Sequence, residues 1–224
     1  MKAGKILNLI FFGPQGSGKG TQAKLLARQL GLRHLSSGEA LRETAKTKTP
    51  LGRYLSRQLS TGILTPIPKL LAVFESYIKK IPKNQGLIFD GFARQITETL
   101  VLLRRLKKLG RPIDATVFIY VSEKEGIKRL SLRGQCDRCN RLFILNSQVK
   151  LGSVCPSCGG KIFQRSDDTP AAIKKRLSLY RKRTLPVIIF FRKQGLLVKI
   201  NGEQSVAAVH EDIVKALKKK KLII

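Results

Sequence analysis

The sequence predicts an α/β fold of three layers, in which a central five-stranded parallel sheet is covered by helices on both faces. Short apolar runs alternate with segments whose apolar residues recur at helical spacing, which is typical of strand–helix–strand units. The first apolar run leads directly into the glycine-rich segment Gly13–Thr21 (GPQGSGKGT), and a helical pattern follows. This order, strand then glycine-rich turn then helix, is typical of a phosphate-binding loop.

Three of the predicted strands lie in the first half of the chain. Lys5–Phe12 (KILNLIFF) is short and almost continuously apolar, as expected for a parallel strand buried on both faces. A helix over Thr21–Leu30 follows the loop, and Gly31 is placed to end it. Arg33–Leu35 can form a short strand, and Leu87–Phe89 (LIF) is a second buried strand.

Between these strands the sequence predicts three helices. Ser36–Glu39 offers an N-cap for a helix that runs to about Lys46. A second short helix fits Leu51–Leu59, and the prolines at 66 and 68 open a third that runs to Lys80.

The second half of the chain repeats the pattern. A long amphipathic helix is predicted from about Gln95 to Leu109, and strands at Ala115–Val121 and Leu196–Ile200, each with a helix after it. Between Gly134 and Gln164 the pattern changes to short polar stretches, glycines and four cysteines. A block of about thirty residues cannot bury a core of its own, so we expect an insertion that needs a cross-link.

Composition places the chain among ordinary globular proteins, with 224 residues of which 42% are hydrophobic. No apolar run approaches the roughly 20 residues of a membrane-spanning helix. The apolar segment Ile6–Phe12 leads into the glycine-rich turn without a small-residue cleavage site, which disfavours a signal peptide. We therefore expect a cytoplasmic protein with no membrane partner.

The net charge of +30 comes from 44 Lys and Arg against 14 Asp and Glu. Such an excess indicates anionic partners, self-repulsion or an unusual host interior. The basic residues are dispersed, apart from a run at Lys218–Lys221 that we interpret as a helix end or tail. With no Trp and 6% aromatic residues, the sequence gives little support to stacking on single-stranded nucleic acid.

The four cysteines form two C-x-x-C pairs separated by fifteen residues: Cys136, Cys139, Cys155 and Cys158. This spacing suits a tetrahedral zinc ion with four thiolate ligands, and a cytoplasmic location disfavours disulfides. Disulfides, free thiols and an iron or redox site are the alternatives. With four protein ligands no coordination position stays open, so we expect a structural metal.

Several motifs resemble those of the adenylate kinase family. The GKGT ending of the loop extends into Gln22-Ala23. Ser37-Gly38 through Arg42 resembles that family's acceptor-binding segment, Asp90–Arg94 (DGFAR) resembles its D-G-F-P-R signature, and Arg165–Asp168 (RSDD) resembles its R-x-D-D stretch. The motifs occur in the family's order and cover nearly the whole chain.

The resemblance implies reversible phosphoryl transfer from ATP to AMP, with Mg²⁺ accompanying ATP. It implies that donor phosphates are held by the loop and two arginines: Gly13, Gly16, Ser17, Gly18, Lys19, Gly20, Thr21, Arg129 and Arg133. It implies an acceptor site formed by Ser37, Gly38, Arg42, Gly91, Arg94, Glu98, Arg165 and Arg176. Catalysis would rest on Lys19, Arg94, Arg129, Arg133, Arg165, Arg176 and Asp90, the last organising Mg²⁺ through water.

The resemblance also implies a P-loop fold with a helical nucleoside-monophosphate (NMP) binding insertion and a zinc-ribbon-like lid. The expected divisions are core over 1–36, NMP-binding insertion over 37–66, core over 67–132, lid over 133–165 and core over 166–224. The lid would close over ATP, and the protein would act as a monomer. Asp167 and Asp168 either cap the following helix or orient arginines near the lid.

Three residues depart from the family's pattern. Gln15 replaces a common glycine, and its side chain must point away from the phosphates. Ala93 replaces the proline of D-G-F-P-R, so the preceding bond can be trans here. Glu98 replaces a glutamine that reads adenine, and an ionised glutamate can only accept hydrogen bonds. It could favour GMP as acceptor, or face solvent while backbone groups hold adenine.

Two other interpretations stay open. One is a nucleoside monophosphate kinase with an altered acceptor; the other is a basic RNA- or ribosome-associated protein that keeps the fold. Nucleic acid is not required by any motif, although the charge would permit weak binding. Neither histidine, His34 or His210, has a sequence neighbour that suggests catalysis, so both are interpreted as structural.

Overall fold

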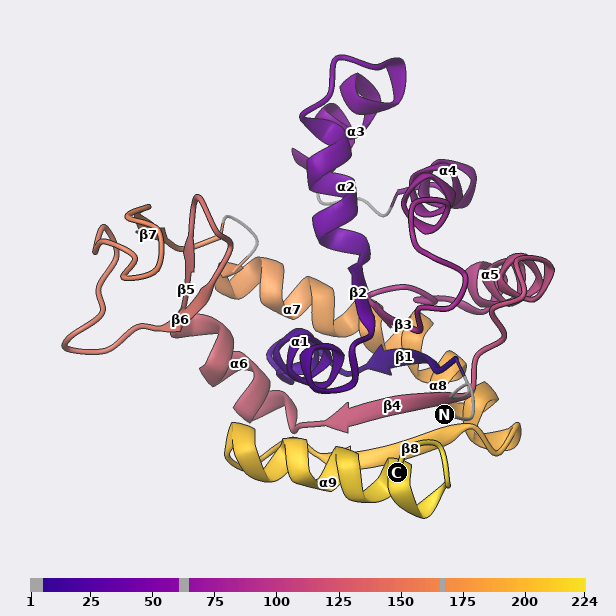
Figure 1. The fold of residues 1–224 in the computed structure, drawn as a ribbon. Helices are drawn as coiled ribbons and strands as arrows, with labels where there is room; N and C mark the ends of the chain where they lie inside the picture. The colour runs from indigo at the N-terminus through magenta and orange to yellow at the C-terminus, as the bar shows by residue number, and fades with distance from the viewer. Residues whose placement is uncertain (1–5, 61–64, 166–167) are drawn as a thin grey trace.

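A computed structural model describes residues 6–60, 65–165 and 168–224 and confirms the predicted architecture (Figure 1). Five parallel strands form the central sheet in the order β2-β3-β1-β4-β8. They are β1 (Asn8–Phe12), β2 (Arg33–Ser36), β3 (Leu87–Asp90), β4 (Ala115–Tyr120) and β8 (Leu197–Asn201). β1 lies at the centre, and its Ile10 is opposite Phe89 of β3 and Thr116 of β4. The predicted start of β1 at Lys5 lies outside the described residues.

Helices cover both faces of this sheet because alternate strand residues point to opposite sides. On one face, Ile10, Phe12 and Phe89 pack against α4 (Ile67–Ile78), α5 (Ile96–Lys108) and α8 (Leu185–Lys193). On the other face, Leu9 and Phe11 pack against α1 (Lys19–Leu30) and α9 (Val206–Lys219). The expected lysine-rich helix end is the C-terminus of α9.

Two smaller parts project from this core (Figure 1). One consists of α2 (Ser37–Ala45) and α3 (Pro50–Ser60). The Ser36 side chain accepts a hydrogen bond from the Glu39 N–H, the predicted cap of α2. The other is a three-stranded antiparallel sheet, β6-β5-β7, which carries the cysteines. Its strands are β5 (Arg133–Cys136), β6 (Leu142–Ile144) and β7 (Ile162–Phe163), and α6 (Glu123–Ser131) leads into it.

The connection back to the core contains a feature that the sequence did not predict. α7 (Pro170–Leu179) continues through a π-helical turn, η2 (Tyr180–Thr184), into α8. Thr169 caps α7 by accepting from the Ala172 N–H. The prediction that Asp168 could cap this helix is therefore wrong, and Asp167 lies outside the described residues. In the described ranges, no helix combines the length and apolarity needed to cross a membrane.

Candidate active site

The glycine-rich loop has the geometry of an anion cradle at the carboxyl end of β1. Gly16 and Gly18 have positive φ values of 83° and 81°, and Gly18 is the N-cap of α1. The first turn of α1 contains no acidic residue. Its N–H groups, which have no partner within the helix, and the positive end of the helix dipole are therefore available to phosphate oxygens.

The loop backbone packs closely against the backbone of β4 and α6. A Cβ atom at Gly16 would lie 2.6 Å from the carbonyl oxygen of Gly126 in α6, and one at Gly13 would lie 2.7 Å from that of Ile119. A side chain at either position would displace the loop. Gln15 Oε1 is buried, and none of the described residues hydrogen-bonds to it. The expected orientation of Gln15 relative to phosphate stays a prediction.

Lys19, at the start of α1, faces Asp90 at the end of β3. Burial lowers the pKa of Lys19 to about 8; Asp90 opposes this shift. The positive charges of Arg94, Arg176 and Arg133 add to it, in that order. The structure thus brings five of the predicted catalytic residues together from four separate parts of the chain.

His34 is a member of this cluster that the sequence did not indicate. Its Nε2 lies 3.6 Å from Asp90 Oδ2, and both side chains are about nine-tenths buried. Burial favours the neutral form of Asp90 and would raise its pKa. The hydrogen bond and charge of His34 and the charge of Lys19 have the larger effect, so the pKa of Asp90 is lowered. The one feature of the sequence that could have indicated this contact is the position of His34 on β2, because β2 pairs with β3 in the sheet.

The predicted acceptor residues Ser37, Gly91 and Arg94 meet at the end of β3. Ser37 Oγ donates to the Gly91 carbonyl oxygen at 2.8 Å, and Arg94 Nε donates to the same oxygen at 2.7 Å. Gly91 has φ 77°, and a Cβ there would lie 2.7 Å from Ser37 Oγ. Gly38 lies beside the Arg42 guanidinium, so this arginine also faces the segment.

Glu98, in the first turn of α5, folds back onto the turn that carries Arg94. Its Oε1 accepts from the Ala93 N–H at 2.8 Å, and its Oε2 from the Arg94 N–H at 3.3 Å. Glu98 is only 6% exposed, so the interpretation that it faces solvent is wrong. The Phe92–Ala93 bond is trans, as the replacement of proline permits, and Ala93 has an unusual φ of 58°.

Asp168 connects two of the predicted catalytic arginines. Its carboxylate is completely buried; it accepts from Arg133 Nε at 2.7 Å and from a second Arg133 nitrogen. It also accepts from Arg176 Nη1 at 3.3 Å. Arg133 begins β5 and Arg176 lies on α7, so Asp168 joins the cysteine-bearing sheet to the core. This is the arginine-orienting role that the sequence left open.

Two predicted site residues make other contacts. Arg129 Nε donates to Glu125 Oε1 at 2.7 Å, one turn back along α6. Arg165 Nε donates to Gln135 Oε1 on β5. Both residues flank the cysteine-bearing sheet, and their expected contacts with substrate stay predictions.

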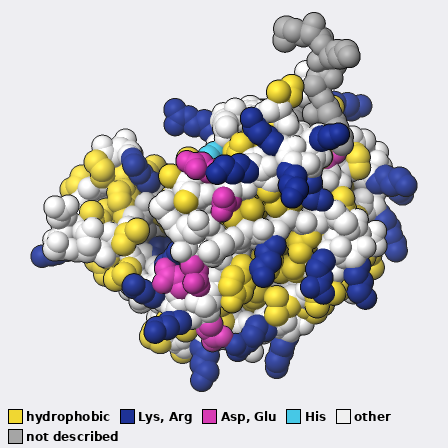
Figure 2. Space-filling view, turned by 90° about the horizontal axis from the view of Figure 1, so that it is seen from below, with side chains coloured by type: hydrophobic (Ala, Val, Ile, Leu, Met, Phe, Trp, Pro, Cys, Tyr) yellow, Lys and Arg dark blue, Asp and Glu magenta, His cyan; other side chains and the backbone are white. Residues whose placement is uncertain are grey.

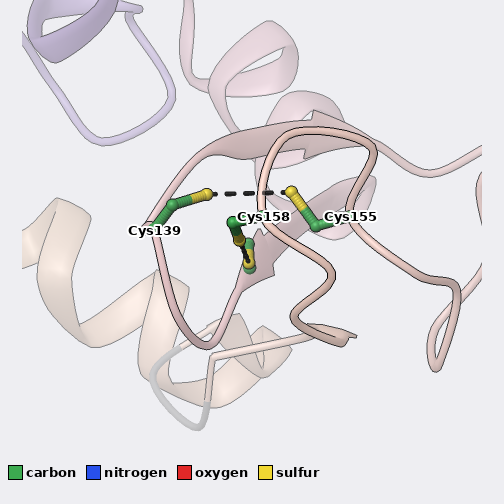
Figure 3. A group of neighbouring side chains, drawn as sticks. Cys139, Cys155 and Cys158 are labelled. Atoms are coloured by element: carbon green, nitrogen blue, oxygen red, sulfur yellow. Dashed lines mark hydrogen bonds between the residues drawn. The ribbon is translucent and has the colours of Figure 1, made fainter.

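Cys139, Cys155 and Cys158 lie close together in Figure 3, and Cys136 at the end of β5 completes the cluster of four. All lie within 4.8 Å of each other, with Cys136 Sγ 3.4 Å from Cys158 Sγ and Cys139 Sγ 3.7 Å from Cys155 Sγ. Sulfurs placed tetrahedrally at about 2.3 Å from a zinc ion would be roughly 3.8 Å apart. The cluster therefore fits a metal ion.

A sheet edge that offers helix amides, a buried lysine and several arginines to an anion is that of a P-loop nucleotide-binding protein. The family model described as adenylate kinase matches residues 11–196. The chain is 35% identical to an adenylate kinase of Kosmotoga olearia, over 94% of this chain and 99% of the relative. It is 37% identical to one of Methanosarcina barkeri and 33% identical to one of Archaeoglobus fulgidus, each over 95% of this chain and 99% of the relative. The chain belongs to the adenylate kinase family and is a phosphotransferase.

Proposed function

We propose that this enzyme reversibly transfers the terminal phosphoryl group of ATP to AMP and produces two ADP. The convergence of Lys19, Arg94, Arg133, Arg176 and Asp90 at the carboxyl edge of the sheet is the observation that supports it most strongly. Phosphoryl transfer needs in-line positioning and neutralisation of charge more than covalent catalysis. A cluster of cations supplied by four separate segments of the chain meets that need.

On the donor side, the amides of the glycine-rich loop would hold the ATP phosphates. These amides belong to the turn and to the start of α1: Gly13, Gly16, Ser17, Gly18, Gly20 and Thr21. The Lys19 side chain would reach the terminal phosphates. Arg133, and Arg129 once the lid has closed, would neutralise charge on the transferring group. Because Asp168 already holds Arg133, that guanidinium is positioned before substrate arrives.

On the acceptor side, Arg94 and Arg42 would bind the phosphate of the monophosphate. Ser37, Gly38 and Gly91 shape the backbone around it, since Ser37 and Arg94 share the Gly91 carbonyl oxygen. Arg176 and Arg165 would contact the acceptor and transferring phosphates together. The two nucleotides would then meet between Lys19 and Arg94.

Two metals are part of this proposal. Asp90 would organise, through water, the Mg²⁺ ion that accompanies ATP, which supplies charge neutralisation on the phosphates. The lowered pKa of Asp90 supports this because the carboxylate stays ionised. The four cysteines would hold zinc in a closed site with no open coordination position, as a structural rather than catalytic metal.

The domain divisions follow from the same proposal. Residues 37–66 would form the NMP-binding insertion and 133–165 the lid, with core segments over 1–36, 67–132 and 166–224. Closure of the lid would exclude water as a competing acceptor. Cysteines gathered in a metal-type cluster suit a reducing cytoplasm, and we propose a monomer there.

A two-substrate assay tests the function. We expect ADP to form from ATP with AMP, with much lower kcat/KM for GMP, CMP or UMP, and Lys19→Ala to abolish turnover. The Lys215→Ala variant, a change on α9 remote from the sheet edge, should retain wild-type rates. Absence of ADP formation with every monophosphate, at saturating ATP and Mg²⁺, would contradict the proposal.

Neither the altered acceptor nor the RNA-binding interpretation is favoured. The Glu98 carboxylate, which was the argument for GMP, is already engaged by two backbone N–H groups. Lys and Arg are scattered over the face shown in Figure 2 rather than gathered into one stripe. RNA retention that falls steeply with salt would revive the second interpretation.

A further inference from the structure

We infer that Glu98 is a positioning residue: its carboxylate holds the Ala93–Arg94 turn so that the Arg94 guanidinium is presented to the acceptor phosphate. This inference rests on the proposed function, because it assigns a role toward the phosphate of the monophosphate. It also means that residue 98 does not recognise the base of the monophosphate.

The first support is the strained backbone that Glu98 holds. Ala93 has φ 58°, a left-handed conformation that is unfavourable for an alanine because its Cβ crowds the backbone. Such a conformation persists only where surrounding contacts fix it. Ala93 is fully buried, and its N–H donates to Glu98 Oε1 at 2.8 Å.

The second support is that the turn is held from both sides. Glu98 accepts from the N–H groups of Ala93 and Arg94, while the Arg94 carbonyl oxygen accepts from Thr184 Oγ1 at 3.0 Å. The Arg94 side chain then turns back, and its Nε donates to Gly91 at 2.7 Å. The backbone of Arg94 is thus fixed before its guanidinium meets a ligand.

The third support is chemical. The two N–H groups donate to different oxygens of the carboxylate, whereas an amide in the same position presents one oxygen and one NH₂ group. With glutamine at position 98, one N–H would face the amide NH₂ group, and a buried donor would lose its partner. If residue 93 were proline, that N–H would not exist. The two departures from the family's D-G-F-P-R and glutamine pattern are therefore in direct contact and chemically matched.

Helix geometry and ionisation agree with this role. Glu98 lies in the first turn of α5, where the helix dipole favours negative charge. Burial raises the pKa of Glu98 above its ordinary value, although Arg94 and the two N–H groups favour the carboxylate. The geometry supports the carboxylate form, because both of its oxygens accept from N–H groups.

The test compares Glu98→Gln with Glu211→Gln, the same chemical change at an exposed position on α9. Wild type and both variants are assayed with AMP, GMP, CMP and UMP. For Glu98→Gln we expect the acceptor KM to rise roughly tenfold, by a similar factor for every base, with the KM for ATP within about twofold. A residue that only stabilises the fold would lower the melting temperature without this difference between the two substrates.

Two further measurements keep the inference testable if Glu98→Gln folds poorly or wild type lacks activity. Thr184→Val removes the other hydrogen bond to the turn and should raise the acceptor KM for all bases by a few fold. Hydrogen exchange of the 93–94 amides, which needs no turnover, should accelerate in Glu98→Gln and not in Glu211→Gln. An inactive wild type would contradict the proposed function alone. A changed AMP-to-GMP preference, an unchanged acceptor KM in active variants or unchanged exchange would overturn the positioning role.

Discussion

Replacing Asp168 with asparagine should destabilise the enzyme and slow the reaction together, because one buried carboxylate serves both. Asp168 is fully buried and accepts from Arg133 and Arg176, whose side chains are 16% and 26% exposed. The amide keeps the shape of the side chain but loses the charge and one acceptor oxygen. Arg133 would then lose the carboxylate that holds it, and Arg176 would lose one of its contacts, in a region already rich in cations.

The expected loss of stability follows from these contacts. Removing one partner of a buried ion pair typically costs about 3–5 kcal/mol. The lower end, about 3 kcal/mol, applies here because both arginines keep some contact with water and the amide oxygen can still accept. For a chain of this size, each kcal/mol lowers the melting temperature by about 2–4 °C. We expect a decrease of roughly 6–12 °C.

The kinetic effect has a separate origin. Without Asp168 the guanidinium of Arg133 is free to move by an ångström or more, and misplacement on that scale costs about a hundredfold in rate. We therefore expect kcat to fall by about that factor, measured with ATP and AMP well below the melting temperature. Differential scanning calorimetry on the same samples gives the thermal shift.

Asp212→Asn is the matched control for this experiment. Asp212 lies on α9 and accepts one hydrogen bond, from Gln204 Nε2 at 2.9 Å, which an amide oxygen can still accept. Its melting temperature should stay within about 2 °C of wild type, as is usual for changes near the surface. If Asp168→Asn behaved like this control in both stability and kcat, the role assigned to Asp168 would be wrong.

Three more predictions concern the loop and the metal. Lys19 must be protonated to hold phosphate, and its pKa of about 8 lies below the ordinary value, so ATP affinity should fall about tenfold between pH 7 and pH 9. Calorimetry of ATP binding in two buffers should show that the enzyme takes up a proton. Binding that does not change with pH would contradict this. Gly16→Ala should raise the KM for ATP and lower the melting temperature, because the new Cβ would meet the Gly126 carbonyl oxygen. Gly152→Ala is the control: Gly152 has φ 86° and no atom within 4 Å of a Cβ, so this variant should show only the destabilisation that comes from placing alanine at a positive φ. Removal of the cysteine-bound metal should lower the melting temperature more than it lowers activity at low temperature, and an apo enzyme as heat-stable as the holoenzyme would refute that.

The sheet and the phosphate loop were predictable because their signals are local. A strand buried on both faces must be apolar along its whole length, and a turn that exposes successive amides to an anion needs glycine. The runs at β1, β3 and β4 and the segment Gly13–Thr21 carry these signals within a few residues. Boundaries shifted slightly, since α1 begins at Lys19 rather than Thr21.

The contacts within the site were less predictable because they join distant segments. His34 meets Asp90 only because β2 pairs with β3, and Asp168 meets Arg133 across 35 residues of sequence. Neither the positive φ of Ala93 nor the π-helical turn Tyr180–Thr184 has a composition that indicates it. Glu98 was identified as an unusual residue, but its partners are backbone N–H groups, which a sequence pattern does not reveal.

The distribution of acidic residues explains how so basic a chain can keep the cations of its candidate active site in place. Among the described residues the buried carboxylates are Asp90, Glu98 and Asp168, and all three lie at the site. Asp90 faces Lys19, Asp168 holds two arginines by their side chains, and Glu98 holds a third by its backbone. Where water is excluded, such contacts fix a cation more firmly than they would at the surface. Preorganised cations need little rearrangement as charge develops on the transferring group, and this is the largest contribution that a protein makes to phosphoryl transfer. Most of the charge of +30 is therefore spread over the chain, whereas Lys19, Arg94, Arg133 and Arg176 are each in contact with a buried acid.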